Sequence, residues 1–328
     1  MGATRLPLSL LVLLGTLRVI SRVSALPPEP EMSTSMLTEN NGTTLHLEEI
    51  FLGRCWDFQR LWKVSPEINC TGLWDKFFHA FSNRDPCDQK PSYYDDFFSA
   101  SAFDTPSAEK TLFWSGTTVL AHEYSNDGLR YTTLEDTLPG YVLNGLRWCG
   151  SLSEPWYNEK TCPKCPPTVP WDSFWRAASR SFAKRARGDV YVMLSGTRKD
   201  QEGKPIDAFV NTSYFGMEEL PNLDQQKVSK VNVWVMHDLI VVPPYREACG
   251  KGSLIQLDQE LSRRGFLMDC TDDPPFLRHL QCVDDPNSKS CTKAATDGTN
   301  TSNAPKITMY KISLSVIIVS AWLVTVNT

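Results

Sequence analysis

The apolar positions of the chain change their spacing about half-way along it. In the first part, apolar residues recur every three or four positions within 47–52, 73–81 and 171–187, and the last of these segments follows Pro170. This period is typical of helices with one buried side. In the second part, the short runs 189–194 and 231–236 are rich in β-branched residues, which predicts buried strands.

The second part also contains a strand–helix–strand pattern. Leu254, Leu257 and Leu261 share one face of a predicted helix within 252–265, and 266–268 predicts a further strand. This order indicates a small parallel sheet covered by helices. We therefore predict an α/β fold, with a mainly helical subdomain at 45–187 and an α/β subdomain at 188–292. A cleft between the two halves is where we expect a ligand.

Both ends of the chain depart from this pattern. Residues 1–25 contain Arg5, an apolar run and small residues up to Ala25, which is typical of a secretory signal peptide, and 26–44 predicts a linker. Residues 293–304 are mostly small and polar. Residues 305–328 form a polar spacer and then an apolar tail, and no lysine or arginine follows the tail. This layout indicates GPI attachment at Asn300, Ser302 or Asn303 with removal of the tail. A single-pass membrane anchor is the alternative. Either kind of anchor would place the protein on the extracellular face of the plasma membrane, and a GPI anchor would hold it in the outer leaflet.

The cysteines agree with an extracellular protein. Ten cysteines, all within the predicted body, favour five disulfides in an oxidising compartment, although their spacing leaves the pairing open. Cys162 and Cys165 have the CxxC spacing, but no second such pair and no histidine lies near them, so disulfides to distant partners are favoured over a zinc or redox site. Four sequons predict glycosylation at Asn41, Asn69, Asn211 and Asn300, of which Asn69 has Cys70 inside its sequon.

Composition and motifs exclude several functions. The 328 residues carry a formal net charge of -5, which argues against binding to nucleic acid. The five histidines form no metal-binding pair, and Walker, GxGxxG and GxSxG motifs are absent, so we expect no metal and no cofactor. The acidic pairs Glu135–Asp136 and Glu218–Glu219 are by themselves typical of a solvated surface, and Trp114 and Trp175 of a core.

Taken together, however, several segments resemble the ADP-ribosyl cyclase and NAD glycohydrolase family of ecto-enzymes over 47–292. The resemblance rests on Leu112–Ser115, Thr133–Thr137, Trp148–Cys149, Ser173–Ser179, Val192–Gly196, Trp234–His237 and Leu280–Cys282. Ile50–Cys55, Asp172–Trp175, Trp234–His237 and the GPI-like tail are most similar to the GPI-anchored bone marrow stromal antigen branch. Thr133–Thr137 is instead similar to the type II membrane-bound lymphocyte cyclase.

The resemblance implies cleavage of the nicotinamide–ribose bond of NAD, which is then a substrate and not a cofactor. Glu219 matches the catalytic carboxylate that stabilises an oxocarbenium-like ribosyl cation. Glu135 matches the acid that grips the nicotinamide amide and biases the fate of this intermediate. The other matched positions bind substrate: Trp114 and Trp175 the rings, Ser179 the ribose, and Ser115 and Phe215 the phosphates.

Two positions differ from relatives. Tyr214 replaces a small threonine of mammalian hydrolases, and a bulky ring there would fold the adenine back and raise the share of cyclic product. Asn144 replaces an aspartate of several relatives, which puts its contribution in doubt. The resemblance also implies a homodimer and the disulfides Cys55–Cys70, Cys87–Cys165, Cys149–Cys162, Cys249–Cys270 and Cys282–Cys291.

The competing function is a GPI-anchored adhesion or receptor protein with little turnover and a cell-surface protein partner. The intact Glu219, Glu135, Trp114 and Trp175 favour the enzyme, because a receptor could have lost any of them.

Overall fold

The computed structural model describes residues 42–101, 108–153, 155–165, 168–200 and 202–291. The predicted signal peptide, most of the linker 26–44 and the GPI segment lie outside the described residues, as do Asn41 and Asn300. In the described ranges, no helix is both long and apolar enough to cross a membrane. Asn69 and Asn211 are exposed, and their glycosylation stays a prediction.

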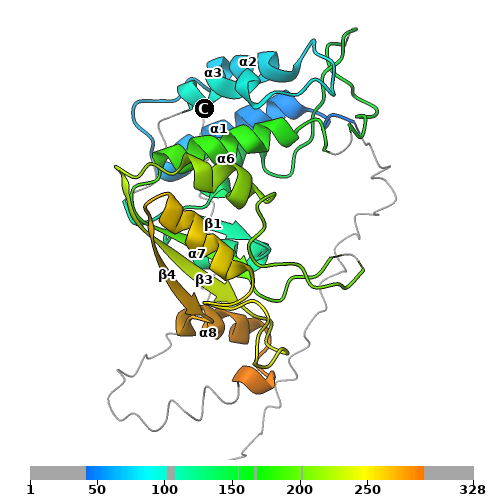
Figure 1. Cartoon of the computed structure of the whole chain (residues 1–328). Helices are drawn as coiled ribbons and strands as arrows, with labels where there is room; N and C mark the ends of the chain where they lie inside the picture. The colour runs from blue at the N-terminus through cyan, green and yellow to red at the C-terminus, as the bar shows by residue number, and fades with distance from the viewer. Residues whose placement is uncertain (1–41, 102–107, 154, 166–167, 201, 292–328) are drawn as a thin grey trace, which may run out of the picture.

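A layer of helices forms one side of the molecule (Figure 1). It contains α1 (Leu47–Trp62), α2 (Cys70–Phe81), η1 (Pro91–Tyr94), α3 (Asp95–Ala100), α5 (Leu138–Leu143) and α6 (Asp172–Arg185). The three predicted helices are thus confirmed, with α1 longer than expected. Their apolar faces enclose an aromatic core that includes Phe51, Phe77, Phe174 and Trp148. The indole nitrogen of Trp148 donates to the Tyr94 hydroxyl at 2.9 Å, so this buried polar group is satisfied.

The other side is a parallel sheet with strand order β1-β2-β3-β4. Its strands are β1 (Leu112–Ser115), β2 (Gly188–Ser195), β3 (Val228–Met236) and β4 (Leu267–Asp272). The two predicted central strands and the third are confirmed. β1 lies in the segment that was expected to be mainly helical, and its four residues are too few to show a strand pattern.

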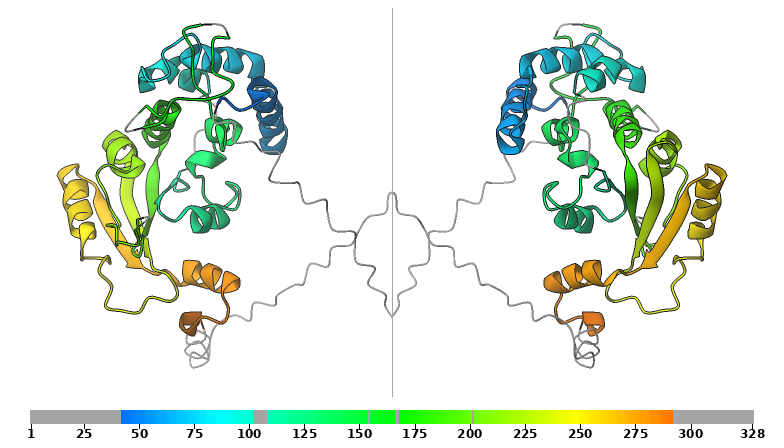
Figure 2. Two further views of the ribbon diagram at one scale, coloured as in Figure 1. Left: turned by 90° about the vertical axis from the view of Figure 1, so that its right-hand side faces the viewer. Right: turned by 90° about the vertical axis from the view of Figure 1, so that its left-hand side faces the viewer.

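Helices cover both faces of the sheet, as Figure 2 shows from two sides. The predicted helix α7 (Ser253–Arg263) packs its leucines on Val190, Val192 and Val233. On the opposite face, α4 (Thr118–Ser125) and α8 (Pro275–Asp284), which were not predicted, cover Met193 and Trp234. Because successive residues of a strand point to opposite faces, β2 and β3 are buried on both.

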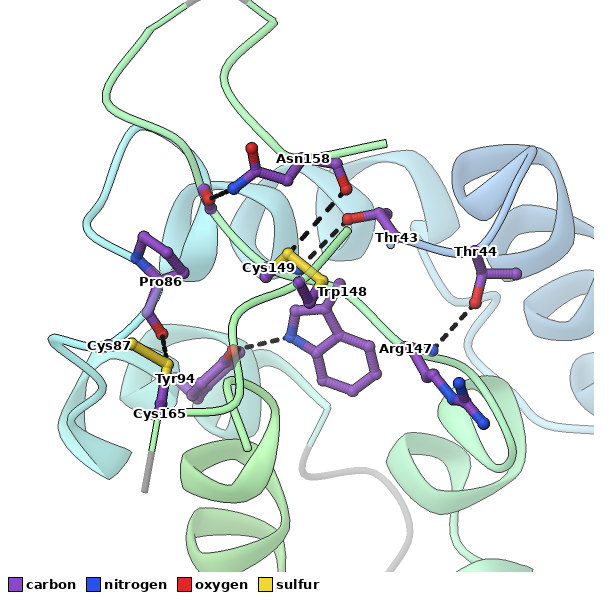
Figure 3. The surroundings of a disulfide bond; sticks show 12 residues. Thr43, Thr44, Pro86, Cys87, Tyr94, Arg147, Trp148, Cys149, Asn158 and Cys165 are labelled. Carbon is purple, nitrogen blue, oxygen red and sulfur yellow. Dashed lines mark hydrogen bonds between the residues drawn. A yellow bond between two sulfur atoms is a disulfide. The ribbon is translucent and has the colours of Figure 1, made fainter. Parts of the chain in front are cut away.

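All five implied disulfides are confirmed: Cys55–Cys70, Cys87–Cys165, Cys149–Cys162, Cys249–Cys270 and Cys282–Cys291. Figure 3 shows Cys149 beside the buried pair of Trp148 and Tyr94, with the bond between Cys87 and Cys165 nearby. The backbone nitrogen of Cys149 also donates to Thr43 Oγ1 at 3.2 Å. These bonds tie the loop before α6 to the helical layer, and α6 forms one wall of the candidate site.

Candidate active site

A cavity of about 560 Å³ lies at the carboxyl ends of β1 and β2. This is the edge of a parallel sheet at which ligands usually bind. Its walls come from β1, α6 and two short segments, η2 (Leu134–Asp136) and η3 (Phe215–Glu219). Every catalytic or substrate-binding residue expected from the sequence lines this one cavity: Trp114, Ser115, Glu135, Trp175, Ser179, Tyr214, Phe215 and Glu219. Asn144 lines it as well.

Glu219 is the most deeply buried acid of the cavity wall. It ends the single π-helical turn η3, and only 6% of it is exposed. Ser179 Oγ donates to Glu219 Oε1 at 3.0 Å, whereas Oε2 is buried and has no hydrogen-bond partner among the described residues. Burial raises the pKa of Glu219 to about 8, and the negative charges of Glu135 and Glu218 add to the effect. A buried carboxylate oxygen without a partner would gain strongly from a cation placed beside it.

The neighbouring Glu218 fixes η3 to α6. Glu218 is 1% exposed; its Oε1 lies 2.6 Å from Arg176 Nε, and its Oε2 pairs with Arg180 Nε. The expectation of a solvated acidic pair is therefore wrong for Glu218 and Glu219, because two guanidinium groups compensate the buried charge of Glu218. Arg176 and Arg180 are four residues apart and share one face of α6. Trp175 and Ser179 have the same spacing and share the adjacent face, which lines the cavity.

Glu135 is positioned by the short turn η2. The turn is closed by a capping box, in which the Thr133 nitrogen donates to Asp136 Oδ2 at 2.8 Å. It also packs tightly on α5, since a Cβ on Gly140 would lie 2.0 Å from the Leu134 carbonyl oxygen. Trp114 Nε1 donates to Glu135 Oε2 at 3.3 Å, so the carboxylate and one of the two cavity tryptophans are joined.

The charge of Glu135 is stabilised by a histidine from α4. Burial alone would raise the pKa of Glu135, but the contact with His122 and the hydrogen bond from Trp114 hold it below its usual value. His122 Nε2 lies 3.4 Å from Glu135 Oε2. Their environments thus favour the carboxylate form of Glu135 and the protonated form of Glu219. The pKa values of the two acids in this cavity are therefore shifted in opposite directions.

The two tryptophans provide flat walls. Trp114 lies near the end of β1 and Trp175 on the second turn of α6, and both are half-buried against the cavity. Trp175 packs edge-on against Phe174, with ring centroids 5.1 Å apart, which fixes its orientation. Planar ligand rings stack on such faces. Trp171, which was not among the expected site residues, also lines the cavity.

Tyr214 and Phe215 differ in their access to the cavity. Tyr214 is 40% exposed at the rim, and its hydroxyl donates to Asp172 Oδ1 at 2.7 Å. Phe215 is 1% exposed and packs on Phe113, so it forms part of the cavity floor.

Sequence reasoning missed the cationic groups of the cavity, Arg147 and Arg198. Arg198 lies in the loop directly after β2. The rule that ligands bind beyond the carboxyl ends of parallel strands would have indicated this loop once β2 was placed. Ser115 precedes Gly116, whose φ of +73° requires the left-handed conformation that glycine adopts freely, and the Arg198 side chain packs close to this glycine. Within the described ranges, no group of three or more His, Cys, Asp or Glu side chains is arranged to hold a metal ion.

Comparison with known proteins gives one consistent family. The family model described as ADP-ribosyl cyclase matches residues 44–291. The ADP-ribosyl cyclase/cyclic ADP-ribose hydrolase of Aplysia californica is 42% identical over 257 residues, which are 76% of this chain and 88% of the relative. The human ADP-ribosyl cyclase/cyclic ADP-ribose hydrolase 2 is 34% identical over 271 residues, which are 81% of each chain.

Solved structures agree with these sequences. Aplysia cyclase complexed with substrate NGD and product cGDPR has a TM-score of 0.69 at 40% identity, and the match covers 76% of this chain and 97% of that one. Porcine CD38 with a covalent intermediate, ribo-F-ribose-5'-phosphate, has a TM-score of 0.64 at 31% identity, with 71% and 98% covered. With a family model that spans the folded body and relatives of this identity, the chain belongs to the ADP-ribosyl cyclase family.

Proposed function

We propose that this protein cleaves the nicotinamide–ribose bond of NAD and forms cyclic ADP-ribose, ADP-ribose or both. The observation that carries the proposal is the position of Glu219, whose buried Oε2 has no partner in the described chain and lines a cavity with two tryptophan faces. The names of the relatives, which include cyclase and cyclic ADP-ribose hydrolase, support the same reaction.

The chemistry follows from the charge that develops during bond cleavage. Nicotinamide leaves as a neutral molecule and takes the bonding electrons, so positive charge moves onto the ribose ring and C1′. A carboxylate facing C1′ stabilises this oxocarbenium-like cation, as in glycoside hydrolysis. The hydrogen bond from Ser179 to Oε1 leaves Oε2 to meet the sugar. Because NAD brings a cationic nicotinamide ring, its binding favours the ionised form of Glu219.

The remaining residues orient the substrate. Trp114 and Trp175 stack the nicotinamide ring and later the adenine ring. Glu135, fixed by Trp114, accepts a hydrogen bond from the carboxamide group of nicotinamide. Arg198 and Ser115 supply a cation and a hydroxyl for the phosphates at the other end. The ribosyl cation then reacts with water, which gives ADP-ribose, or with the tethered adenine, which gives the cyclic product. The ring of Tyr214 at the rim favours the second fate.

Product analysis tests this proposal. The purified protein is incubated with NAD and with its guanine analogue, and the products are separated by chromatography. We expect nicotinamide release together with cyclic and linear products. Glu219→Gln should abolish release, and the control Glu48→Gln, an exposed acid of α1, should leave it unchanged. Nicotinamide release that survives Glu219→Gln contradicts the assignment of the carboxylate.

The adhesion or receptor function would require no such site. Its expected signature is a folded protein that consumes no NAD under conditions in which a relative does. The retained pairing of Ser179 with Glu219 and of Trp114 with Glu135 favours the enzyme, because turnover is what demands both arrangements.

The proposed location is the extracellular face of the plasma membrane, through GPI at Asn300, Ser302 or Asn303. It is supported by the five disulfides, which belong to an oxidising compartment. Treatment of expressing cells with a phospholipase specific for phosphatidylinositol should release the activity into the medium. Activity that stays on the cells favours a spanning anchor. The homodimer implied by the family is tested by light scattering of the released protein.

A further inference from the structure

His122 lies behind the cavity wall, next to Glu135. It belongs to α4, which packs on β1 and α8 and contributes no residue to the cavity lining. The ring of His122 packs edge-on against Trp114, with centroids 5.6 Å apart. One third of its side chain is exposed, yet the Nε2 atom itself is buried. The histidine therefore directs its inner nitrogen toward the site and leaves the other side of the ring near solvent.

Both side-chain contacts of Glu135 converge on one oxygen. Oε2 accepts from Trp114 Nε1 at 3.3 Å and lies 3.4 Å from His122 Nε2. The second distance is long for a hydrogen bond but close for an ion pair, so the contact depends strongly on the charge of the histidine. When His122 is protonated, the carboxylate is compensated from behind. When His122 is neutral, Glu135 keeps its charge in the cavity without this partner.

The surroundings of His122 favour its charged form. The pKa of His122 is raised, chiefly by its contact with Glu135, and the acids Asp136 of η2 and Asp127 after α4 add to this, while burial opposes it. From α8, Asp284 acts on the adjacent Glu123 of α4. The side chain therefore changes charge above its ordinary pKa of 6.5.

We propose that His122 is a positioning residue of the reaction, which holds Glu135 through Oε2 and thereby sets the ratio of cyclic to linear product. This inference rests on the proposed function and deepens it. Glu135 is the acid beside the reacting ring, and a carboxylate without a compensating cation keeps water bound near it. Water adds to C1′ and releases a proton to solvent, which gives the linear product. Loss of the proton from His122 therefore raises the linear share.

The experiment measures the product ratio as a function of pH. NAD is incubated with the wild-type protein between about pH 5.5 and about pH 8.5, and nicotinamide, cyclic and linear products are quantified separately. The same series is run on His122→Gln and His122→Asn, which keep a neutral polar group, and on His279→Gln as a control. His279 is an exposed residue of α8. Thermal melting of each variant is recorded to identify loss of folding.

In the wild-type protein and the control, we expect the linear-to-cyclic ratio to rise about two- to fivefold with pH, the factor that a partly exposed ion pair supplies. In both His122 variants, the ratio should be independent of pH while nicotinamide release continues. A merely structural histidine would lower melting temperature and total turnover but leave the slope of the ratio intact. That result, or a flat or falling ratio in the wild-type protein, overturns the inference alone. Absence of nicotinamide release from the wild-type protein overturns the proposed function as well.

Discussion

The buried acid at the centre of the site should reduce the stability of the folded protein. Glu219 has an ordinary pKa of 4.5 and a folded-state pKa of about 8, because burial penalises its charge. Below the lower value, both folded and unfolded chains are protonated, and the residue has no effect. Between the two values, only the unfolded chain ionises, so stability falls as pH rises. Above the upper value, both states are ionised and the loss is complete.

The size of the effect follows from the shift. Each pKa unit corresponds to about 1.4 kcal/mol, so the full loss is about 4 to 5 kcal/mol. In the Glu219→Gln variant, the amide oxygen would accept from Ser179 as the carboxylate Oε1 does, and the amide does not titrate. This variant should therefore gain about 4 kcal/mol of unfolding free energy relative to the wild type between about pH 5 and about pH 8.5. The same substitution should abolish nicotinamide release.

The assay is urea denaturation of both proteins at a series of pH values, with the disulfides intact. Other titrating groups are common to the two proteins, so the difference between their unfolding free energies isolates residue 219. We expect a difference that grows in favour of Glu219→Gln as pH rises. A difference that is constant across the range would refute the reasoning, because it would mean that Glu219 ionises as easily in the folded protein as in the unfolded chain.

Three further predictions follow from the same contacts. First, kcat/KM for nicotinamide release should rise with pH and level off above about 8, because burial raises the pKa of Glu219 to about 8 and the proposed mechanism requires its carboxylate form; a flat profile from acid to alkaline pH contradicts this role. Second, Tyr214→Thr should lower the share of cyclic product, whereas Tyr214→Phe, which loses only the hydrogen bond to Asp172, should keep it. Equal shares of cyclic product from the wild-type protein and both variants, measured by chromatography, would show that the ring is irrelevant. Third, Arg180→Ala should destabilise the protein by roughly 2 to 3 kcal/mol, because Glu218 is buried and loses one of its two cationic partners. Adding Glu218→Gln should restore part of this loss in urea denaturation, and simple additivity of the two changes would count against the ion-pair network.

Strong local patterns made much of the fold predictable. The aromatic spacing after Pro170 predicts α6, and the β-branched runs predict β2 and β3, because each of these elements buries a regular face. β1 has four residues, and α4 has a mixed surface with only Ala121 and Ser125 buried, so neither shows a clear period. Both are held mainly by tertiary packing on β2 and α8.

The gathering of the expected site residues in one cavity was predictable from residue types joined to a family resemblance, but their electrostatics were not. No local signal distinguishes Glu218 from a surface acid, because its two arginines come from a helix about forty residues earlier. His122 is a single histidine, and its partner Glu135 is brought to it by η2, which packs on α5 and α6. Such pairings depend on the folded arrangement and leave no periodic trace in the chain.

The most direct test of the central claim is a crystal structure of Glu219→Gln with NAD bound, since this variant should bind substrate without cleaving it. We predict intact NAD in the cavity with nicotinamide stacked between Trp114 and Trp175, its carboxamide on Glu135, and C1′ about 3.5 Å from the side chain of residue 219. The account would be contradicted by NAD bound outside this cavity. It would also be contradicted by NAD bound in the reverse orientation, with its phosphates beside residue 219 and C1′ turned away.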